Sequence, residues 1–347
     1  MPQKRVAVAM SGGIDSSVAV ALLKNQGYQV FGITMILHSK PDKEQSATLK
    51  QVAGSLSIPH HMIDLRRHFQ RQVIKPFCNE YGQGRTPNPC IACNQYIKFG
   101  LLLNKARKMG ADYLATGHYA RIETGPDGYR LLRGVDHGKD QSYFLYTLGQ
   151  QQLRHLLLPM GELYKNQVRR IARELGLSEN AGHESQDICF IPDNDYRSFV
   201  AGHVSSQPGD IVDTSGKVLG KHSGLAYYTV GQRQGLGLAS DRRLYVLKLD
   251  ARNNRLVVGS QGYLLSNGLT ANRLSWTSGK APQDGDNITA KIRYKSPEAA
   301  ASLRLNQDTA EVSFCQPQRS ISPGQAVVFY RGEAVLGGGI IESSEIS

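Results

Sequence analysis

Short apolar runs alternate with amphipathic stretches along residues 1–202. The strand candidates, rich in β-branched and other apolar residues, are 5–10, 29–35, 60–64 and 113–116. The helix candidates, with apolar residues at helical spacing, are 18–26, 44–57, 96–109 and 165–175. Strands and helices that alternate in this way build a parallel sheet covered by helices. The pattern therefore predicts a doubly wound α/β domain over residues 1–202.

The remainder of the chain has glycine-rich turns and short strands. The segments 208–210 and 213–216 are typical of turns, and residues 287–295 alternate apolar and polar side chains as a half-buried strand does. Further strand candidates are 309–314 and 325–330. We expect a small β-rich domain at 203–265 and a β-barrel-like domain at 266–347.

Positive charge is spread over the whole length. The 41 lysines and arginines exceed the 29 acidic residues, which gives a formal charge of +12. A broad basic surface suits a polyanion such as nucleic acid, although basic proteins without such a partner also occur. In the helix candidate 165–175, Lys165 and Arg169 are placed opposite Val168 and Ala172, on a side that is either a basic binding face or a solvated one.

Hydrophobicity and cysteine usage indicate a compartment. No apolar run approaches the roughly 20 residues that a bilayer span needs, and the run 6–10 is too short for a signal sequence. The five cysteines are odd in number and unevenly spaced, unlike the disulfide framework of a small secreted domain. We expect a cytoplasmic protein without a membrane partner.

The segment Ser11-Gly12-Gly13-Ile14-Asp15-Ser16 joins the first strand to the first helix. Glycines allow close backbone approach, and the N–H groups and positive dipole end of a helix start converge on one point, which suits a phosphate. The hydroxyls of Ser11, Ser16 and Ser17 can donate to phosphate oxygens. The Asp15 carboxylate either helps to hold Mg²⁺ or caps the helix. An ordinary glycine turn with a capping serine is the simpler alternative.

This loop lacks the Gly-Lys-Ser/Thr ending of a Walker A motif. It resembles instead the PP-loop of ATP pyrophosphatases, which transfer AMP to a substrate oxygen and release pyrophosphate. The resemblance implies that ATP is cleaved between its α and β phosphates. It leaves the acceptor open, because this superfamily includes small-molecule synthetases as well as tRNA-modifying enzymes.

Two cysteine segments narrow the choice of acceptor. Cys93 closes the segment 86–93 just before a predicted helix, whose dipole is expected to lower the pKa of this thiol, and Cys189 lies in the segment 184–191. The other matching segments are 116–119, 139–143 and 228–233. Together these segments closely resemble the tRNA-specific 2-thiouridylase family, over nearly the whole chain.

The resemblance implies a sequence of chemical steps on the wobble uridine of tRNA. The C2 oxygen is adenylated by ATP, which makes it a leaving group that sulfur can displace. Cys189 would carry a persulfide received from a sulfur donor such as a cysteine desulfurase or a sulfur-relay protein. Cys93 would act as the nucleophile, and the Cys93–Cys189 disulfide that results must be reduced before the next turnover.

Cys90 departs from the family, many members of which have Asp at this position. Cys90, Cys93 and Cys189 could instead hold a [4Fe-4S] cluster with an open iron for sulfide, as in the three-cysteine PP-loop tRNA thiolases that the chain also resembles. Zinc is a third reading, for which no fourth ligand is evident. Cys78 and Cys315 match no motif and are expected to be buried.

The resemblance also implies binding residues, and Asp15 is counted among the catalytic groups. The expected ATP contacts are Ala9, Met10, Ser11, Gly12, Gly13, Ile14, Asp15, Ser16, Met35 and Gly117. The expected tRNA contacts are His118, Lys139, Asp140, Gln141, Arg293, Tyr294 and Gln325. Two other functions stay open at this point: an AMP-forming synthetase with a small-molecule acceptor, and a basic RNA-binding protein with a vestigial nucleotide loop.

Overall fold

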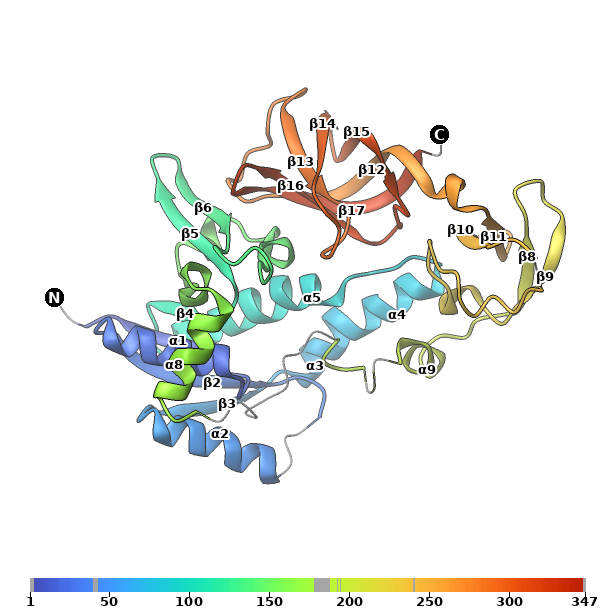
Figure 1. The fold of residues 1–347 in the computed structure, drawn as a ribbon. Helices are drawn as coiled ribbons and strands as arrows, with labels where there is room; N and C mark the ends of the chain where they lie inside the picture. Colours follow the sequence, from blue (N-terminus) through green and yellow to red (C-terminus); the bar gives the residue numbers. More distant parts are fainter. Residues whose placement is uncertain are drawn as a thin grey trace.

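The computed structural model describes residues 3–39, 43–177, 188–191, 193, 195–239 and 241–345 (Figure 1). Its first part is a five-stranded, fully parallel sheet in the order β3-β2-β1-β4-β7. The strands are β1 Arg5–Ala9, β2 Gln29–Ile36, β3 His60–Asp64, β4 Tyr113–Ala115 and β7 Leu156–Leu157. The strand segments that the sequence predicted are all present in this sheet.

Helices cover both faces of the sheet. The helical segments of this first part are α1 Ile14–Asn25, α2 Lys43–Ser55, α3 Arg66–Phe69, η1 Gln70–Ile74, α4 Lys75–Gly82, α5 Pro89–Ala92, η2 Cys93–Leu102, α6 Leu103–Lys108, η3 Ser142–Leu145, α7 Gln150–Leu153, η4 Pro159–Glu162, α8 Lys165–Glu174 and α9 Tyr196–Ala201, of which α9 packs near α4 away from the sheet. Val6 and Val8 pack against α1, α2 and α8, whereas Ala7 and Phe31 share a core with η2, α6 and residues 326–330 of the last part of the chain. Strands β1 and β2 are apolar nearly throughout because both of their faces are buried, whereas the edge strand β3 is half-buried or exposed.

Two β-rich parts follow the parallel sheet. A four-stranded sheet, in the order β10-β11-β8-β9, consists of β8 Gly209–Val212, β9 Val218–His222, β10 Tyr245–Asp250 and β11 Arg255–Gly259. It is accompanied by η6 Leu225–Tyr227 and η7 Gln261–Leu264. The last part contains β12 Leu265–Trp276, β13 Asn287–Lys291, β14 Ala299–Asn306, β15 Thr309–Arg319, β16 Ala326–Arg331 and β17 Ala334–Glu345. These six antiparallel strands close into a barrel because β12 pairs with both β15 and β17.

A hairpin from the first part extends the barrel sheet. Strands β5 Ala120–Gly125 and β6 Gly128–Arg133 pair with each other, and β6 pairs with β17 at Leu132 and Ala334. Figure 1 shows this hairpin rising from the α/β layer beside the barrel. The fold class predicted from the pattern, a doubly wound domain followed by β-rich domains with a barrel last, is confirmed. The hairpin, which ties the first part to the last, was not predicted.

Several predicted boundaries shift for physical reasons. The helix predicted at 96–109 begins at Pro89, because Pro suits the first helical position and Asn88 Oδ1 caps it by accepting from Cys90 N at 3.1 Å. Strand β13 ends at Lys291 rather than 295, because the chain turns where Ser296 N bonds to the Arg293 carbonyl. No helix in the described part is long and apolar enough to cross a membrane.

Candidate active site

The phosphate loop (residues 11–16) lies where the strand order reverses. The chain places β2 and β3 on one side of β1 and β4 and β7 on the other, and open α/β sheets bind ligands at the carboxyl edge of such a switch point. Gly117 follows β4 at this edge. A Cβ atom added to Gly117 would lie 3.0 Å from Asp15 Cβ and 3.1 Å from Ser16 N. The loop after β1 and the loop after β4 are therefore in contact.

Hydroxyl groups of the phosphate loop hold its own backbone. Ser16 Oγ and Ser17 Oγ donate to the Gly13 carbonyl at 2.9 and 3.2 Å. Gly12 has φ +84°, a conformation that favours glycine, and Gly13 is the N-cap of α1. The Ser16 and Ser17 hydroxyls were expected to face phosphate, but here they stabilise the loop. The backbone N–H groups at the start of α1 are further donors that an anion could use here.

Asp15 does not cap α1, since Gly13 occupies the cap position without a side-chain bond. Asp15 Oδ1 instead accepts from Lys165 Nζ at 2.7 Å and from Tyr119 OH at 2.9 Å. Lys165 is 6% exposed, so of the two readings of the polar side of α8, a binding face or a solvated one, the solvated one does not hold for this residue. Its side chain turns into the sheet edge because an anionic partner there compensates the cost of burying an ammonium group.

The other predicted ATP contacts lie along the same edge. Ala9 is the last residue of β1, Met10 N donates to the Ile33 carbonyl at 2.8 Å, and Met35 is the penultimate residue of β2. Thr34 Oγ1 ties the two strand ends together by donating to the Met10 carbonyl at 2.9 Å. This places the predicted adenosine and phosphate contacts on neighbouring strand ends, as one bound nucleotide requires.

We predict that Gly117→Ala weakens binding of an ATP analogue about tenfold. The added Cβ would press on Asp15 and Ser16 at 3.0 to 3.1 Å, closer than ordinary contact, so the phosphate loop must move by a few tenths of an ångström. Calorimetric titration measures the loss. Gly54→Ala is the matched control, because nothing lies within 4 Å of its added Cβ. Equal affinity in the two variants would contradict this packing.

Three thiols gather at the start of the α5–η2 helix. Cys93 shares a core with Phe190 and Ile191, the neighbours of Cys189, and a negative charge on Cys189 or on Cys90 raises the pKa of Cys93. All five cysteines are free thiols in the structure. Residues 184–187 of the predicted segment lie outside the described residues. The structure thus brings together the two cysteines that are nearly a hundred positions apart, with Cys90 beside them.

The expected low pKa of Cys93 was wrong. Burial raises the pKa of this thiol to about 12, opposed by the positive charge of Lys98. The helix begins at Pro89, so Cys93 lies one turn inside it and not at the positive dipole end. Cys90 and Cys189 present surface to solvent, yet the protein atoms around their sulfurs also raise the pKa of both. Cys78 is buried as expected, whereas Cys315 is exposed.

The three thiols do not form a metal-binding group as they are arranged. Within the described ranges, no three His, Cys, Asp or Glu side chains converge so as to hold a metal ion. A [4Fe-4S] cluster needs three thiolates directed at one centre, and tetrahedral zinc needs four ligands. As they are arranged, the three thiols therefore do not present the donor set of either group.

His118 links the phosphate loop to the thiols. It follows Gly117, its ring lies 5.7 Å from that of Phe99 in η2, and its Nδ1 shares a hydrogen bond of 2.7 Å with Thr116 Oγ1. Burial, reinforced by the Lys98 charge, holds the pKa of His118 well below its usual range. His118 is therefore neutral at physiological pH and can contact a base by hydrogen bonding or stacking, not as a cation.

The other predicted tRNA contacts lie where the first part meets the barrel. Gln325 Nε2 donates to the Thr86 carbonyl at 2.9 Å, and Tyr294 packs on Phe144 with ring centroids 4.4 Å apart. Arg293 Nη2 donates to the carbonyls of Arg319 and Ser320. Gln325 thus joins the barrel to the segment that leads to Cys90, Tyr294 packs on η3, and the two Arg293 hydrogen bonds stay within the barrel.

The segment 139–141 is partly structural. Asp140 is buried, and its carboxylate accepts from Gly134 N, Ser142 N and Ser142 Oγ at 2.8 to 3.1 Å. Gln141 Oε1 accepts from Tyr119 N at 3.0 Å. This bond holds the backbone of Tyr119, whose hydroxyl donates to Asp15. Lys139 lies at the start of the segment, where its backbone N donates to the Asp136 carbonyl.

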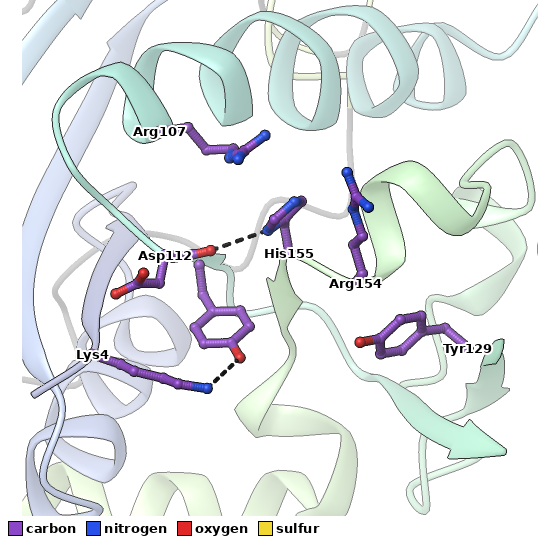
Figure 2. A pocket seen from close by; sticks show the side chains of 7 residues that line it. Lys4, Arg107, Asp112, Tyr129, Arg154 and His155 are labelled. Carbon is purple, nitrogen blue, oxygen red and sulfur yellow. Dashed lines mark hydrogen bonds between the residues drawn. The ribbon is translucent and has the colours of Figure 1, made fainter. Parts of the chain in front are cut away.

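Two basic hollows lie on the surface, one away from the site and one near the thiols. The first, of about 400 Å³, lies at the amino ends of β1, β4 and β7, so it is separate from the phosphate loop (Figure 2). Its lining residues are Lys4, Arg107, Asp112, Tyr113, Tyr129, Arg154 and His155. The second, of about 550 Å³, is lined by Arg66, Arg67, Arg71 and Lys75 and reaches Phe190, the neighbour of Cys189. The second hollow places positive charge next to the thiols.

Sequence reasoning missed Tyr119, Lys165 and Lys98. Tyr119 and Lys165 both contact Asp15 but come from segments 104 and 150 residues later in the chain. Lys98 follows Cys93 by five residues in the π-helical stretch η2, a spacing that brings it back over Cys93. A regular α-helix, with 3.6 residues per turn, would place Lys98 on a different side of the helix from Cys93, so the helical pattern of the sequence did not indicate that the two residues interact.

Comparison with known proteins identifies the family. The model described as tRNA methyl transferase HUP domain matches residues 4–193, the tRNA methyl transferase PRC-barrel domain matches 197–260, and the aminomethyltransferase β-barrel domain matches 266–341. The tRNA-specific 2-thiouridylase MnmA of Acidithiobacillus ferrooxidans is 45% identical over 352 residues, which cover 99% of this chain and 100% of the relative. The chain belongs to the tRNA-specific 2-thiouridylase family.

A second full-length relative agrees with this membership. MnmA of Carboxydothermus hydrogenoformans is 48% identical over 358 residues, which cover 98% of each chain. A solved 4-thiouridine synthetase–RNA complex with bound ATP also matches, at 17% identity and a TM-score of 0.37, over 50% of this chain and 41% of that chain. The methyltransferase wording belongs to the domain models, whereas the full-length relatives are named as thiouridylases.

Proposed function

We propose that the chain converts the wobble uridine of tRNA to 2-thiouridine, with ATP activating the C2 oxygen and a cysteine persulfide supplying the sulfur. The observation that carries this proposal is a continuous row of side chains from the phosphate loop to the thiols. The loop that carries Gly117 contacts the loop that carries Asp15, and His118 packs on η2. The charge of Lys98, also in η2, lowers the pKa of both His118 and Cys93. A base bound along this row faces ATP at one end and sulfur at the other.

The first step forms an adenylated base. The C2 oxygen of uridine attacks the α-phosphorus of ATP. The bond between the α-phosphorus and the oxygen that bridges to the β-phosphate breaks, and pyrophosphate leaves. The N–H groups at the start of α1 hold the phosphates, and Asp15 is the side chain that would hold Mg²⁺. When bound, Mg²⁺ would offset charge on the leaving pyrophosphate. The neutral His118 orients the base.

The second step delivers sulfur. Cys189 carries a persulfide, and the Cys93 thiolate attacks its inner sulfur, so a Cys93–Cys189 disulfide forms and hydrosulfide is released. Hydrosulfide attacks C2 of the adenylated base, and AMP leaves with the former C2 oxygen. The persulfide is thereby reduced by two electrons at the expense of Cys93, and a dithiol or thiol reductant restores both cysteines. The shared core of Cys93 and the Cys189 neighbours supports this pairing.

The partners of the proposal follow from charge and exposure. The tRNA anticodon arm would lie over the second basic hollow and the barrel junction that carries Arg293, Tyr294 and Gln325. Cys189 is exposed, which a sulfur donor of the cysteine desulfurase or sulfur-relay class requires. The proposal places the reaction in the cytoplasm, where tRNA and such donors meet.

A reconstituted reaction tests the proposal. Purified protein with ATP, Mg²⁺, a cysteine desulfurase with cysteine, a thiol reductant and unmodified tRNA should yield 2-thiouridine at the wobble position, detected by nucleoside mass spectrometry. AMP and pyrophosphate should form in equal amounts with it. Faster AMP formation with a small metabolite than with tRNA would instead indicate a small-molecule synthetase. Tight tRNA binding without AMP formation would indicate an RNA-binding protein.

A further inference from the structure

Lys165 is a buried cation at the phosphate loop to which the thiolation steps above give no task. It is the first residue of α8, where its backbone N donates to Asp136 Oδ2 at 2.9 Å. Its side chain is 7% exposed, and Nζ lies 2.7 Å from Asp15 Oδ1 and 5.7 Å from the centre of the Tyr119 ring. A buried ammonium group is retained where it has an anion to bind.

The geometry around Asp15 leaves one carboxylate oxygen for another ligand. Lys165 and Tyr119 both donate to Oδ1, whereas Oδ2 accepts no hydrogen bond from any residue in the described ranges. The Asp15 side chain is 30% exposed, and the phosphate loop surrounds it. A carboxylate beside a triphosphate is repelled unless cations stand between them. Lys165 and a metal ion at Oδ2 would be those cations.

We propose that Lys165 binds the β- and γ-phosphates of ATP, and the pyrophosphate released from them, by exchanging Asp15 for phosphate oxygens when Mg²⁺ occupies the Asp15 carboxylate. Two cations compete for one carboxylate, and the divalent ion with oxygen ligands displaces the ammonium group. An ammonium group is a compact point charge on a flexible stem, which suits a phosphate. Tyr119 keeps the carboxylate oriented during the exchange. This inference rests on the proposed ATP chemistry.

Binding measurements without turnover test this role. We expect Lys165→Met to weaken binding of Mg²⁺-loaded α,β-methylene-ATP and of pyrophosphate by about 10- to 100-fold, the range for loss of a charge-assisted hydrogen bond. Binding of AMP, which lacks the β- and γ-phosphates, should change less than about twofold, a selectivity that a structural role would not produce. Lys165→Arg should recover part of the affinity, because it restores the charge.

Controls separate the possible failures. Lys24→Met removes a lysine at the far end of α1, where Nζ donates to the Leu56 carbonyl at 2.6 Å, and it should leave all three affinities unchanged. Unchanged pyrophosphate binding in Lys165→Met would overturn the proposal. An equal loss of affinity for AMP and for pyrophosphate in Lys165→Met would also overturn it, provided that this variant unfolds at the same temperature as the wild type.

A double-mutant cycle tests the exchange itself. Asp15→Asn should weaken Mn²⁺ binding to the ATP-analogue complex, measured by electron paramagnetic resonance, and its effect should be non-additive with that of Lys165→Met. Additive effects would contradict a shared role. These readouts do not depend on tRNA or sulfur. If they fail while the wild-type protein thiolates tRNA, only the role of Lys165 is refuted. If they succeed while the wild-type protein forms no 2-thiouridine, only the proposed thiolation is refuted.

Discussion

Cys93→Ser should reduce 2-thiouridine formation by at least about a thousandfold while tRNA-dependent release of pyrophosphate continues within a fewfold of wild type. A serine hydroxyl cannot attack a persulfide sulfur at neutral pH, so no hydrosulfide is released. In the proposed mechanism, adenylation uses the phosphate loop and Asp15, which contact Gly117 and Lys165. Parallel assays of pyrophosphate and of thiolated nucleoside on one reaction measure both effects.

Radioactive sulfur shows which of the two cysteines carries the persulfide and which one attacks it. With ³⁵S-cysteine and a desulfurase, Cys93→Ser should accumulate label on Cys189 that dithiothreitol releases, because the persulfide forms but is not consumed. Cys189→Ser should accept no such label. Cys315→Ser is the matched control, since Cys315 is exposed on β15 and should leave both labelling and thiolation unchanged. Thiolation that survives in Cys93→Ser would remove the proposed nucleophile.

The α/β domain could be predicted because its signals are local. Strand β3 was predicted at its observed bounds, His60–Asp64, and β1 and β2 to within a residue. The apolar runs of β1 and β2 are buried on both faces and cannot be confused with turns, whereas β3 is an edge strand whose side chains are half-buried or exposed. The strand-loop-helix context of residues 11–16 likewise predicted the phosphate loop. Local patterns also predicted a β-rich second half and a barrel-like end.

Features that depend on tertiary contact could not be predicted. The β5–β6 hairpin joins β17, and nothing in the residues 120–133 indicates a partner two hundred positions away. Lys165 has the sequence environment of a solvated lysine and is buried only because Asp15 lies across the sheet edge. The pKa of Cys93 depends on its burial against Phe190 and Ile191, which no helix pattern contains.

Cys90 shows how a short spacing can mislead. The C-x-x-C of Cys90 and Cys93 is compatible with metal binding in sequence, but residues three apart on one helix also lie on one face for packing reasons alone. Here Asn88 caps the helix through Cys90 N, and Cys93 turns into the core. The spacing therefore records helix geometry as much as chemistry.

In the free enzyme at pH 7.5, the Cys93 thiol should react with iodoacetamide about a thousandfold more slowly than a cysteine whose pKa has the ordinary value. Only the thiolate reacts, and raising the pKa from the ordinary value near 9 to about 12 lowers the thiolate fraction by three powers of ten. Restricted access to the buried sulfur slows the reaction further. Peptide mass spectrometry after timed alkylation measures each cysteine separately.

The pH dependence separates acidity from access. Because the thiolate fraction grows tenfold per pH unit below the pKa, the Cys93 alkylation rate should rise about tenfold per unit from pH 7 to 9 with no plateau. Lys98→Met should lower the rate again, because the Lys98 charge opposes the effect of burial. A plateau near pH 7 would show a preformed thiolate and contradict the structure. A slow thiol in the free enzyme has a mechanistic use: Cys93 is protected from oxidants, and activation must come from the bound adenylate or from the persulfide on Cys189.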